Sequence, residues 1–137
     1  MNLQGEIILI DDDSDDREFF EIAYNDLNCT NKLKQFANSQ DAIAYLRDPK
    51  VRPFMIVSDI NMNTTNGLEL REVIFHDEGL HEKCIPYIFM TGGENPMQAK
   101  EAYKKSAQGF FLKRNSMDDY KKLLANIISY WQHSIPD

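Results

Sequence analysis

The side chains that could do chemistry together come directly after apolar segments that are far apart in this sequence. Asp11 and Asp12 follow the first such segment, Asp59 and Thr91 end two others, and Lys113 follows the last. Carboxylates that lie a few ångströms apart repel one another, so a site that gathers them needs positive charge. The lysine supplies one charge, and all-oxygen ligands suit Mg²⁺ rather than Zn²⁺ as a second cation.

This set of residues is suited to the transfer of a phosphoryl group to a carboxylate. An aspartate can act as the nucleophile and form an aspartyl phosphate, and catalysis then requires mainly positioning and the neutralisation of charge. Mg²⁺ and Lys113 would neutralise the transferred group, and the Thr91 hydroxyl would donate to one of its oxygens. Gly92, directly after Thr91, would leave room beside it.

The elements that must bring these residues together alternate between strand and helix. Strands are expected at 6–10, 33–37, 55–59, 86–90 and 109–112, each followed by a segment with helical spacing of apolar residues. Strict alternation favours one parallel sheet with helices on both faces. The carboxyl ends of its strands share one edge, where open α/β folds form their sites. The segments that begin near Ile7, Met55 and Tyr87 are the most apolar and are expected to be central.

Local signals predict where several helices begin and end. Ser14 is expected to be the N-cap of the first helix, and Ser116 that of the last. The third helix is expected to continue to about Glu78, with Gly79 as its C-cap. The segment 95–106 is expected to form a helix with a thin apolar face made of Met97, Ala102 and Tyr103.

Length and composition are those of one cytoplasmic globular domain. The 137 residues are 42% hydrophobic and 27% charged, which is ordinary for a soluble protein with a real core. A net charge of −7 argues against nonspecific binding to nucleic acid or anionic lipid. The two cysteines are expected to be free thiols in a reducing cytosol. The sequence lacks the features of a signal peptide, and no apolar segment reaches the ~20 residues that span a bilayer.

The order and spacing of these residues resemble the response-regulator receiver domain of bacterial two-component signalling, with the chemotaxis receiver as an example. The resemblance covers nearly the whole chain and rests on Asp11-Asp12 with Arg17 five residues past Asp12, on Asp59 with Gly67 eight residues later, on Thr91-Gly92, and on Phe110 three residues before Lys113. It implies a flavodoxin-like α/β fold with a five-stranded, doubly wound parallel sheet in the order 2-1-3-4-5. It also implies that residues 1–137 form a single receiver domain with no output domain.

The resemblance assigns roles to the matching residues. Asp59 would accept a phosphoryl group from a sensor histidine kinase or a histidine phosphotransfer protein, in a phosphorelay in which the receiver is no enzyme beyond slow self-dephosphorylation. Asp12 would be the main carboxylate ligand of Mg²⁺, with Asp11 acting largely through a metal-bound water and Asn61 offering its backbone carbonyl. The phosphoryl-binding and switch residues would be Thr91, Gly92, Lys113 and the aromatic Phe110.

The resemblance also implies a signalling surface. Phosphorylation would turn Phe110 inward and change the face formed by the fourth helix, the fifth strand and the last helix. Because successive strand side chains alternate, Phe111 is expected on the opposite face from Phe110. This surface would contact an unknown downstream protein or a second copy of the chain, and its expected residues are Tyr103, Lys104, Lys105, Phe111 and Tyr120.

Two positions depart from the family pattern. The proline usual four residues after the phosphoacceptor is Asn63 here, and the proline usual after the lysine is Arg114. In the family the lysine–proline bond is typically cis, but a cis bond before a non-proline residue costs ~2.5–4 kcal/mol. This cost favours a trans Lys113–Arg114 bond, but the sequence alone leaves the isomer open, and either departure would change how the two loops sit.

Two other interpretations stay open. A haloacid-dehalogenase-like phosphatase would use Asp11 as its nucleophile, with Asp13, Thr91 and Lys113 as further site residues. Against it, Asp15 stands where that family has Thr or Val, no late acidic pair ends a strand, and the chain is short. A degenerate receiver would bind its partner without phosphorylation. Nucleotide or flavin binding is disfavoured because the sequence has neither a P-loop nor GxGxxG.

Overall fold

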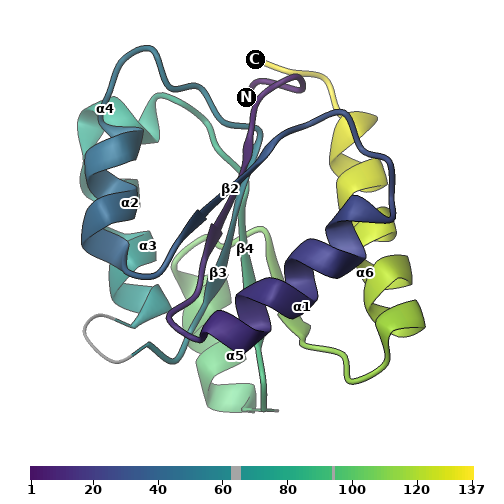
Figure 1. Cartoon of the computed structure of the whole chain (residues 1–137). Coiled ribbons are helices and arrows are strands. Elements are labelled where there is room, and N and C mark those ends of the chain that lie inside the picture. Colours follow the sequence, from purple (N-terminus) through teal and green to yellow (C-terminus); the bar gives the residue numbers. More distant parts are fainter. Residues whose placement is uncertain (63–65, 94) are drawn as a thin grey trace.

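The computed structural model describes residues 1–62, 66–93 and 95–137, and the Asn63 position lies outside them. Strands and helices alternate as predicted, with one additional short helix (Figure 1). In chain order the elements are β1 (Ile7–Ile10), α1 (Ser14–Asn25), β2 (Leu33–Phe36), α2 (Ser39–Leu46), β3 (Met55–Asp59), α3 (Gly67–His76), α4 (Glu78–His81), β4 (Tyr87–Thr91), α5 (Pro96–Lys104), β5 (Gly109–Leu112) and α6 (Met117–Gln132).

The five strands form one parallel sheet in the order β2-β1-β3-β4-β5, as the family resemblance implied. The most apolar strands, β1, β3 and β4, occupy the central positions, and all of their residues are buried. Burial on both faces explains why their sequences are continuously apolar. The register pairs Asp59 with Met90 and Thr91 with Leu112, so β3, β4 and β5 end at the same edge of the sheet.

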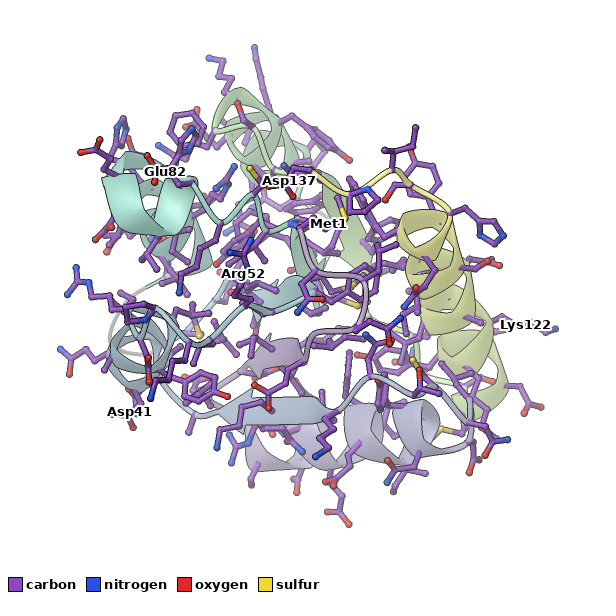
Figure 2. All side chains as sticks on the ribbon, turned by 90° about the horizontal axis from the view of Figure 1, so that it is seen from above. Met1, Asp41, Arg52, Glu82, Lys122 and Asp137 are labelled. Carbon is purple, nitrogen blue, oxygen red and sulfur yellow. The ribbon has the colours of Figure 1, made fainter. Side chains whose placement is uncertain are left out.

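Helices cover both faces of the sheet and enclose two apolar cores (Figure 1). On one face, α1 and α6 bury side chains such as Phe20 and Leu124 against the sheet. On the other face, α2, α3, α4 and α5 bury side chains such as Leu70 and Ala102. Figure 2 shows side chains filling the space between the sheet and both helical layers. The chain termini lie at the end of the sheet opposite to the edge where the strands finish (Figure 1).

Of the two N-caps predicted for the first and last helices, one is confirmed and the other is wrong. Ser116 caps α6 as expected, because its hydroxyl accepts a 3.4 Å hydrogen bond from the backbone N–H three residues on. The N-cap of α1 is Asp13 rather than Ser14, and its carboxylate accepts from the N–H groups of Asp15 and Asp16. A carboxylate at this position also interacts favourably with the helix dipole, which a hydroxyl does much less.

The third helix is shorter than predicted. It ends at His76, and Asp77 takes up an extended conformation with φ −81° and ψ 114°. The Asp77 carboxylate accepts a 3.1 Å hydrogen bond from the N–H of Leu80, so this residue caps α4. Gly79 consequently lies inside α4 and is not the C-cap of α3. The cause is a side chain that competes for backbone groups, a known property of aspartate.

The predicted apolar face of α5 is wrong for two of its three residues. Ala102 is fully buried, but Met97 is 79% exposed and Tyr103 is 56% exposed. The helix packs through Ala102, near its C-terminal end, while the residues at its N-terminal end are exposed. Helical spacing alone therefore overestimated how much of this helix is covered by the sheet.

Three smaller expectations can be compared directly with the structure. Cys29 is half-buried, Cys84 is exposed, and both are free thiols as predicted. Among residues 1–62, 66–93 and 95–137 no peptide bond is cis, so the Lys113–Arg114 bond, whose isomer the sequence left open, is trans. Within the same ranges, no helix has the length and apolar character that crossing a membrane requires.

Candidate functional site

The Lys113 ammonium lies among three carboxylates at the carboxyl edge of the sheet. Its Nζ donates to Asp16 Oδ2 at 2.7 Å, to Asp11 Oδ2 at 2.8 Å and to Asp59 Oδ2 at 3.2 Å. One oxygen from each carboxylate lies within 4.8 Å of the others. Asp11 and Asp59 are buried, and Asp16 is half-buried. The structure thus brings together three of the predicted strand-end residues, and it adds Asp16.

Backbone contacts fix the positions from which these side chains reach the cluster. Lys113 follows β5 directly, and its N–H donates to the Thr91 carbonyl at 2.7 Å, which extends the pairing of β4 with β5. Asp11 continues β1, and its carbonyl accepts a 2.7 Å hydrogen bond from Arg17 Nη1. This contact ties the first turns of α1 to the end of β1, and it gives a structural reason for the spacing between the acidic pair and Arg17.

Gly67, the first residue of α3, lies in close backbone contact with the end of β3. Its N–H donates to the Ile60 carbonyl at 2.8 Å. A Cβ at this position would lie 2.2 Å from the Asp59 carbonyl oxygen and 2.9 Å from the Phe89 ring. Both distances are too short for a carbon atom, so the approach requires glycine. The eight-residue spacing from Asp59 to Gly67 therefore reflects a close backbone contact.

The cluster has an excess of negative charge. Three ionised carboxylates around one ammonium leave a formal charge of −2. Burial raises the pKa of Asp11, and this effect outweighs the hydrogen bond from Lys113, which acts in the opposite direction. Burial alone would lower the pKa of Lys113, but its hydrogen bonds to Asp11 and Asp16 raise it instead. The lysine is therefore a permanent cation, and the chemistry of the remaining oxygens suits a hard divalent ion.

Two other predicted metal ligands lie near this cluster. Asp12 is half-buried and, within the described part of the chain, lies outside the group of three carboxylates. Asn61 is exposed, its N–H donates to Asp59 Oδ1 at 3.2 Å, and its side-chain oxygen accepts from Gln98 Nε2 at 3.1 Å. The loop thus holds one oxygen of Asp59 while Lys113 holds the other. The assignments of Asp12 and of the Asn61 carbonyl to Mg²⁺ stay predictions.

Thr91 and Gly92 lie at the end of β4, on the same edge as the cluster. Thr91 is 1% exposed, and its hydroxyl donates to the Gly93 carbonyl at 3.3 Å. A Cβ added to Gly92 would meet no atom within 4 Å, so the space beside this residue is open, and its use by a phosphoryl group stays a prediction. Among the described residues, no hydrogen bond joins the Thr91 hydroxyl to the three clustered carboxylates, and its phosphoryl-binding role stays a prediction.

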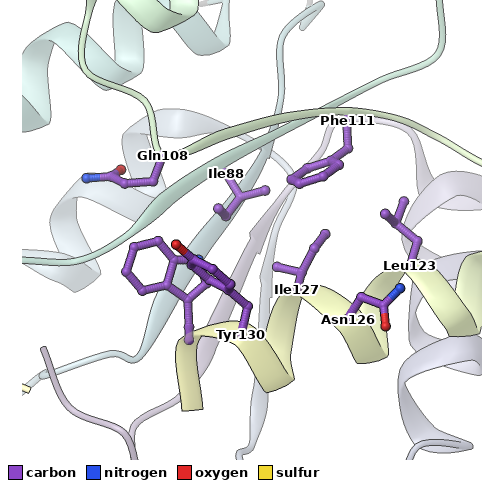
Figure 3. A pocket seen from close by; sticks show the side chains of 8 residues that line it. Ile88, Gln108, Phe111, Leu123, Asn126, Ile127 and Tyr130 are labelled. Atoms are coloured by element: carbon purple, nitrogen blue, oxygen red, sulfur yellow. The ribbon is translucent and has the colours of Figure 1, made fainter. Parts of the chain in front are cut away.

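Phe110 and Phe111 point to opposite faces of β5, as predicted. Phe110 packs with the core under α5, with ring centroids 6.3 Å from Phe89 and 6.5 Å from Tyr103. Phe111 packs with the core under α6. There it lines an apolar groove of about 530 Å³, and Figure 3 shows its ring pointing toward Ile88, with Ile127 below it. The groove shares none of its lining residues with the acidic cluster.

The predicted signalling surface is only partly exposed. Tyr103 and Lys104 are exposed, and Lys105 is half-buried beside a glutamate of α3 with which it forms an ion pair. Tyr120 is 4% exposed and packs edge-on against the ring of Phe20, so it belongs to the core and not to the surface. The reason is that Tyr120 lies on the stripe of α6 that faces the sheet and α1.

Asp16 is the member of the cluster that the sequence analysis missed. The acidic residues at the start of α1 have the pattern of caps and solvated charges, and Asp13 does act as a cap. A signal was nevertheless present, because Asp16 precedes Phe20 by four residues and residues at this spacing share one face of a helix. Phe20 is buried against the sheet, so the same face carries Asp16 toward the sheet's edge.

Comparisons of the sequence with known proteins find matches over most of this chain. Residues 7–125 match the response regulator receiver domain. The chain is 23% identical over 129 residues to the probable methanogenesis regulatory protein FilR2 of Methanothrix harundinacea, a match that covers 91% of this chain and 82% of that protein.

Solved structures show the same fold at low sequence identity. The phosphorylated cyanobacterial phytochrome response regulator RcpA has a TM-score of 0.84 and 20% identity, with 97% of both chains covered. The Mn²⁺-bound form of response regulator Rcp1 has a TM-score of 0.81 and 20% identity, covering 96% of this chain and 97% of that one. The chemotaxis response regulator CheY4 of Vibrio cholerae has a TM-score of 0.73 and 21% identity, covering 90% and 98%. Because the family match extends over most of the sequence, this chain belongs to the response regulator receiver domain family.

Proposed function

We propose that this receiver accepts a phosphoryl group on Asp59 in a cytoplasmic, Mg²⁺-dependent phosphorelay and signals by protein–protein contact. The donor would be the phosphohistidine of a sensor histidine kinase or of a histidine phosphotransfer protein. The observation that carries the proposal is the shared contact of Asp59 and Asp11 with the Lys113 ammonium at the carboxyl edge of the sheet. Receiver domains are typically phosphoacceptors rather than enzymes, and we expect no more than slow self-dephosphorylation here.

The contacts of Asp59 suit it to act as the nucleophile. One of its oxygens would form the new O–P bond while the P–N bond to the donor histidine breaks and the imidazole leaves. Oδ1 is held by the N–H of Asn61 and Oδ2 by Lys113, so the carboxylate is oriented before the donor arrives. Lys113 would then neutralise charge on the transferred group, which is the main demand that phosphoryl transfer makes on a protein.

A divalent ion fits the donor set that surrounds Asp59. Asp11, Asp12, Asp59 and the Asn61 carbonyl would hold Mg²⁺, which would supply further neutralisation of the phosphoryl oxygens. Support comes from the clustering of one carboxylate oxygen each of Asp11, Asp16 and Asp59 within 4.8 Å, a group that contains two of these ligands, and from its uncompensated negative charge. The related Rcp1 structure was solved in a Mn²⁺-bound form.

The signal would travel through Thr91 and Phe110 to the surface formed by α5, β5 and α6. The Thr91 hydroxyl, which donates to the Gly93 carbonyl in this structure, would turn to the phosphoryl group. Phe110 is half-buried beside Tyr103, and it would move further inward. The resulting change would be presented to a downstream protein or a second copy of the chain through Tyr103, Lys104, Lys105 and Phe111.

The phosphatase alternative has less support. It requires Asp13 as a second catalytic acid near Asp11, but Asp13 Oδ1 already accepts the N–H groups of Asp15 and Asp16 at 2.9 and 3.1 Å. Asp13 is also exposed, whereas Asp11 and Asp59 are buried. The degenerate-receiver alternative predicts equal partner affinity with and without beryllofluoride plus Mg²⁺.

The proposal is tested by intact-mass measurement after incubation with a small phosphodonor and Mg²⁺. We expect the wild-type chain to gain one phosphoryl group and Asp59→Ala to gain none. A matched control is Asp48→Ala, which removes an exposed aspartate outside the cluster and should label normally. Equal labelling of Asp59→Ala and the wild type would show that Asp59 is not the phosphoacceptor.

A further inference from the structure

The shortest ion pair of Lys113 is made with a residue that the proposed phosphoryl transfer does not require. Nζ lies 2.7 Å from Asp16 Oδ2, compared with 3.2 Å from the phosphoacceptor Asp59. We propose that Asp16 is a positioning residue that holds the Lys113 ammonium in the resting site and competes with the phosphoryl group for it. This inference rests on the proposed function, because it describes how the same site regulates the acceptance of an anion.

The exposure of the side chains indicates from which side each carboxylate approaches the ammonium. The side chains of Asp11 and Asp59 are 4% and 10% exposed, whereas that of Asp16 is 44% exposed. Asp16 therefore contacts Lys113 from the solvent side of the cluster. A phosphoryl donor must also approach Asp59 from solvent, so the donor's anionic group and the Asp16 carboxylate would seek the same face of the ammonium.

The position of Asp16 on its helix allows its charge to be changed without removing a cap. Asp13 is the N-cap of α1, and its carboxylate binds the free N–H groups of the first turn. The Asp16 side chain instead points to Lys113, so Asp16→Asn keeps the side-chain volume and the cap while removing one negative charge from the cluster. Asp15 lies beside it in the same turn, is exposed, and provides the matched control.

Competition for the ammonium predicts that removing the Asp16 charge changes the affinities for a cation and for an anion in opposite directions. A carboxylate in the cluster attracts a cation and repels an anion, so its neutralisation should weaken Mg²⁺ binding and strengthen the binding of a phosphoryl mimic. A structural defect would weaken both, because it would disorder the residues on which both ligands depend. Opposite shifts therefore separate positioning of Lys113 from a general loss of structure.

The experiment titrates the whole chain by calorimetry, first with Mg²⁺ in the absence of any phosphoryl compound and then with beryllofluoride at saturating Mg²⁺. For Asp16→Asn we expect Mg²⁺ affinity to fall on the order of tenfold and beryllofluoride affinity to rise severalfold, as Coulomb interactions over a few ångströms near solvent imply. Asp15→Asn should stay within about twofold of the wild type in both titrations, since its charge is screened by water. Asp16→Glu, which restores the carboxylate, should return both affinities toward the wild-type values.

The outcomes separate this inference from the function on which it rests. If the wild type does not bind beryllofluoride, or if Asp59→Asn binds it equally well, the proposed function fails and the competition model fails with it. If wild-type binding depends on Asp59 but Asp16→Asn behaves like Asp15→Asn, or loses affinity for both ligands, only the role of Asp16 is overturned.

Discussion

Replacing Lys113 with methionine should destabilise the fold by about 2–3 kcal/mol at neutral pH without Mg²⁺. The substitution keeps an unbranched side chain but removes the ammonium from three carboxylates. Asp11 and Asp59 are 3% and 8% exposed and cannot easily move into water. Removing one partner of a buried ion pair typically costs ~3–5 kcal/mol. The loss should fall at or below the lower end of that range because the Asp16 side chain is 44% exposed and can turn to solvent.

This loss should depend on pH and on Mg²⁺. Burial already raises the pKa of Asp11 in the wild type, and losing the ammonium would raise it further. A carboxyl group whose folded-state pKa is raised makes the folded state bind more protons than the unfolded state, so the variant should become less stable as pH rises toward neutral. Below the ordinary pKa of aspartate both states are protonated, and the deficit should shrink. At neutral pH, Mg²⁺ should restore much of the stability that Lys113→Met loses, because it supplies an alternative cation.

The assay is urea unfolding followed by circular dichroism, with chelator or with Mg²⁺. Lys122→Met is the matched control, because Lys122 projects into solvent from α6 (Figure 2) and should change stability by less than about 0.5 kcal/mol. Equal stability of Lys113→Met and Lys122→Met without Mg²⁺ would refute the account of the cluster. So would a deficit that Mg²⁺ leaves unchanged.

Three further substitutions test the surroundings of the site, each by urea unfolding. Gly67→Ala should cost about 1–3 kcal/mol of stability, because the added Cβ would lie 2.2 Å from a backbone oxygen. Gly79→Ala, inside α4, should be neutral or stabilising, because the atom nearest to its added Cβ would be 3.6 Å away. Equal effects of the two substitutions would contradict this. Arg71→Met should be close to neutral, because it loses a 3.1 Å hydrogen bond from Nη2 to the Ser106 carbonyl but removes a buried guanidinium that has no carboxylate partner among the described residues and whose Nε has no hydrogen-bond partner. A loss above about 3 kcal/mol would contradict that view. Asp11→Asn should stabilise the Mg²⁺-free protein at neutral pH. The gain in the free energy of unfolding should shrink toward acid pH, because burial raises the pKa of Asp11. A gain that grows toward acid pH would contradict this prediction.

The parts of the fold that could be predicted are those in which one physical cause dominates. Strands buried on both faces must be continuously apolar, which located β1, β3 and β4, and their parallel arrangement then placed the residues that follow them at one edge. Asp11, Asp59 and Lys113 meet for this reason. The strand order itself came from the family resemblance, because alternation alone does not determine it.

The parts that were wrong or missing are those in which local signals compete. Asp13 and Ser14 both suit an N-cap, and only the geometry of the turn decides between them. Asp77 ends one helix and caps the next, where the sequence predicted a single helix to about Glu78 with Gly79 as its C-cap. Asp16 has the sequence context of a solvated charge, and its contact with Lys113 depends on how α1 docks on the sheet, which the spacing to Phe20 indicates only in retrospect.

A crystal structure of the wild-type chain with Mg²⁺ and beryllofluoride tests the central claim most directly. We predict a beryllium–oxygen bond to Asp59, a Lys113 ammonium in contact with a fluorine, and Mg²⁺ coordinated by carboxylate oxygens of Asp59 and of the acidic residues that follow β1. A beryllofluoride group bound elsewhere, or a lysine that points away from Asp59 in the complex, would contradict the assignment of this edge of the sheet as the phosphoacceptor site.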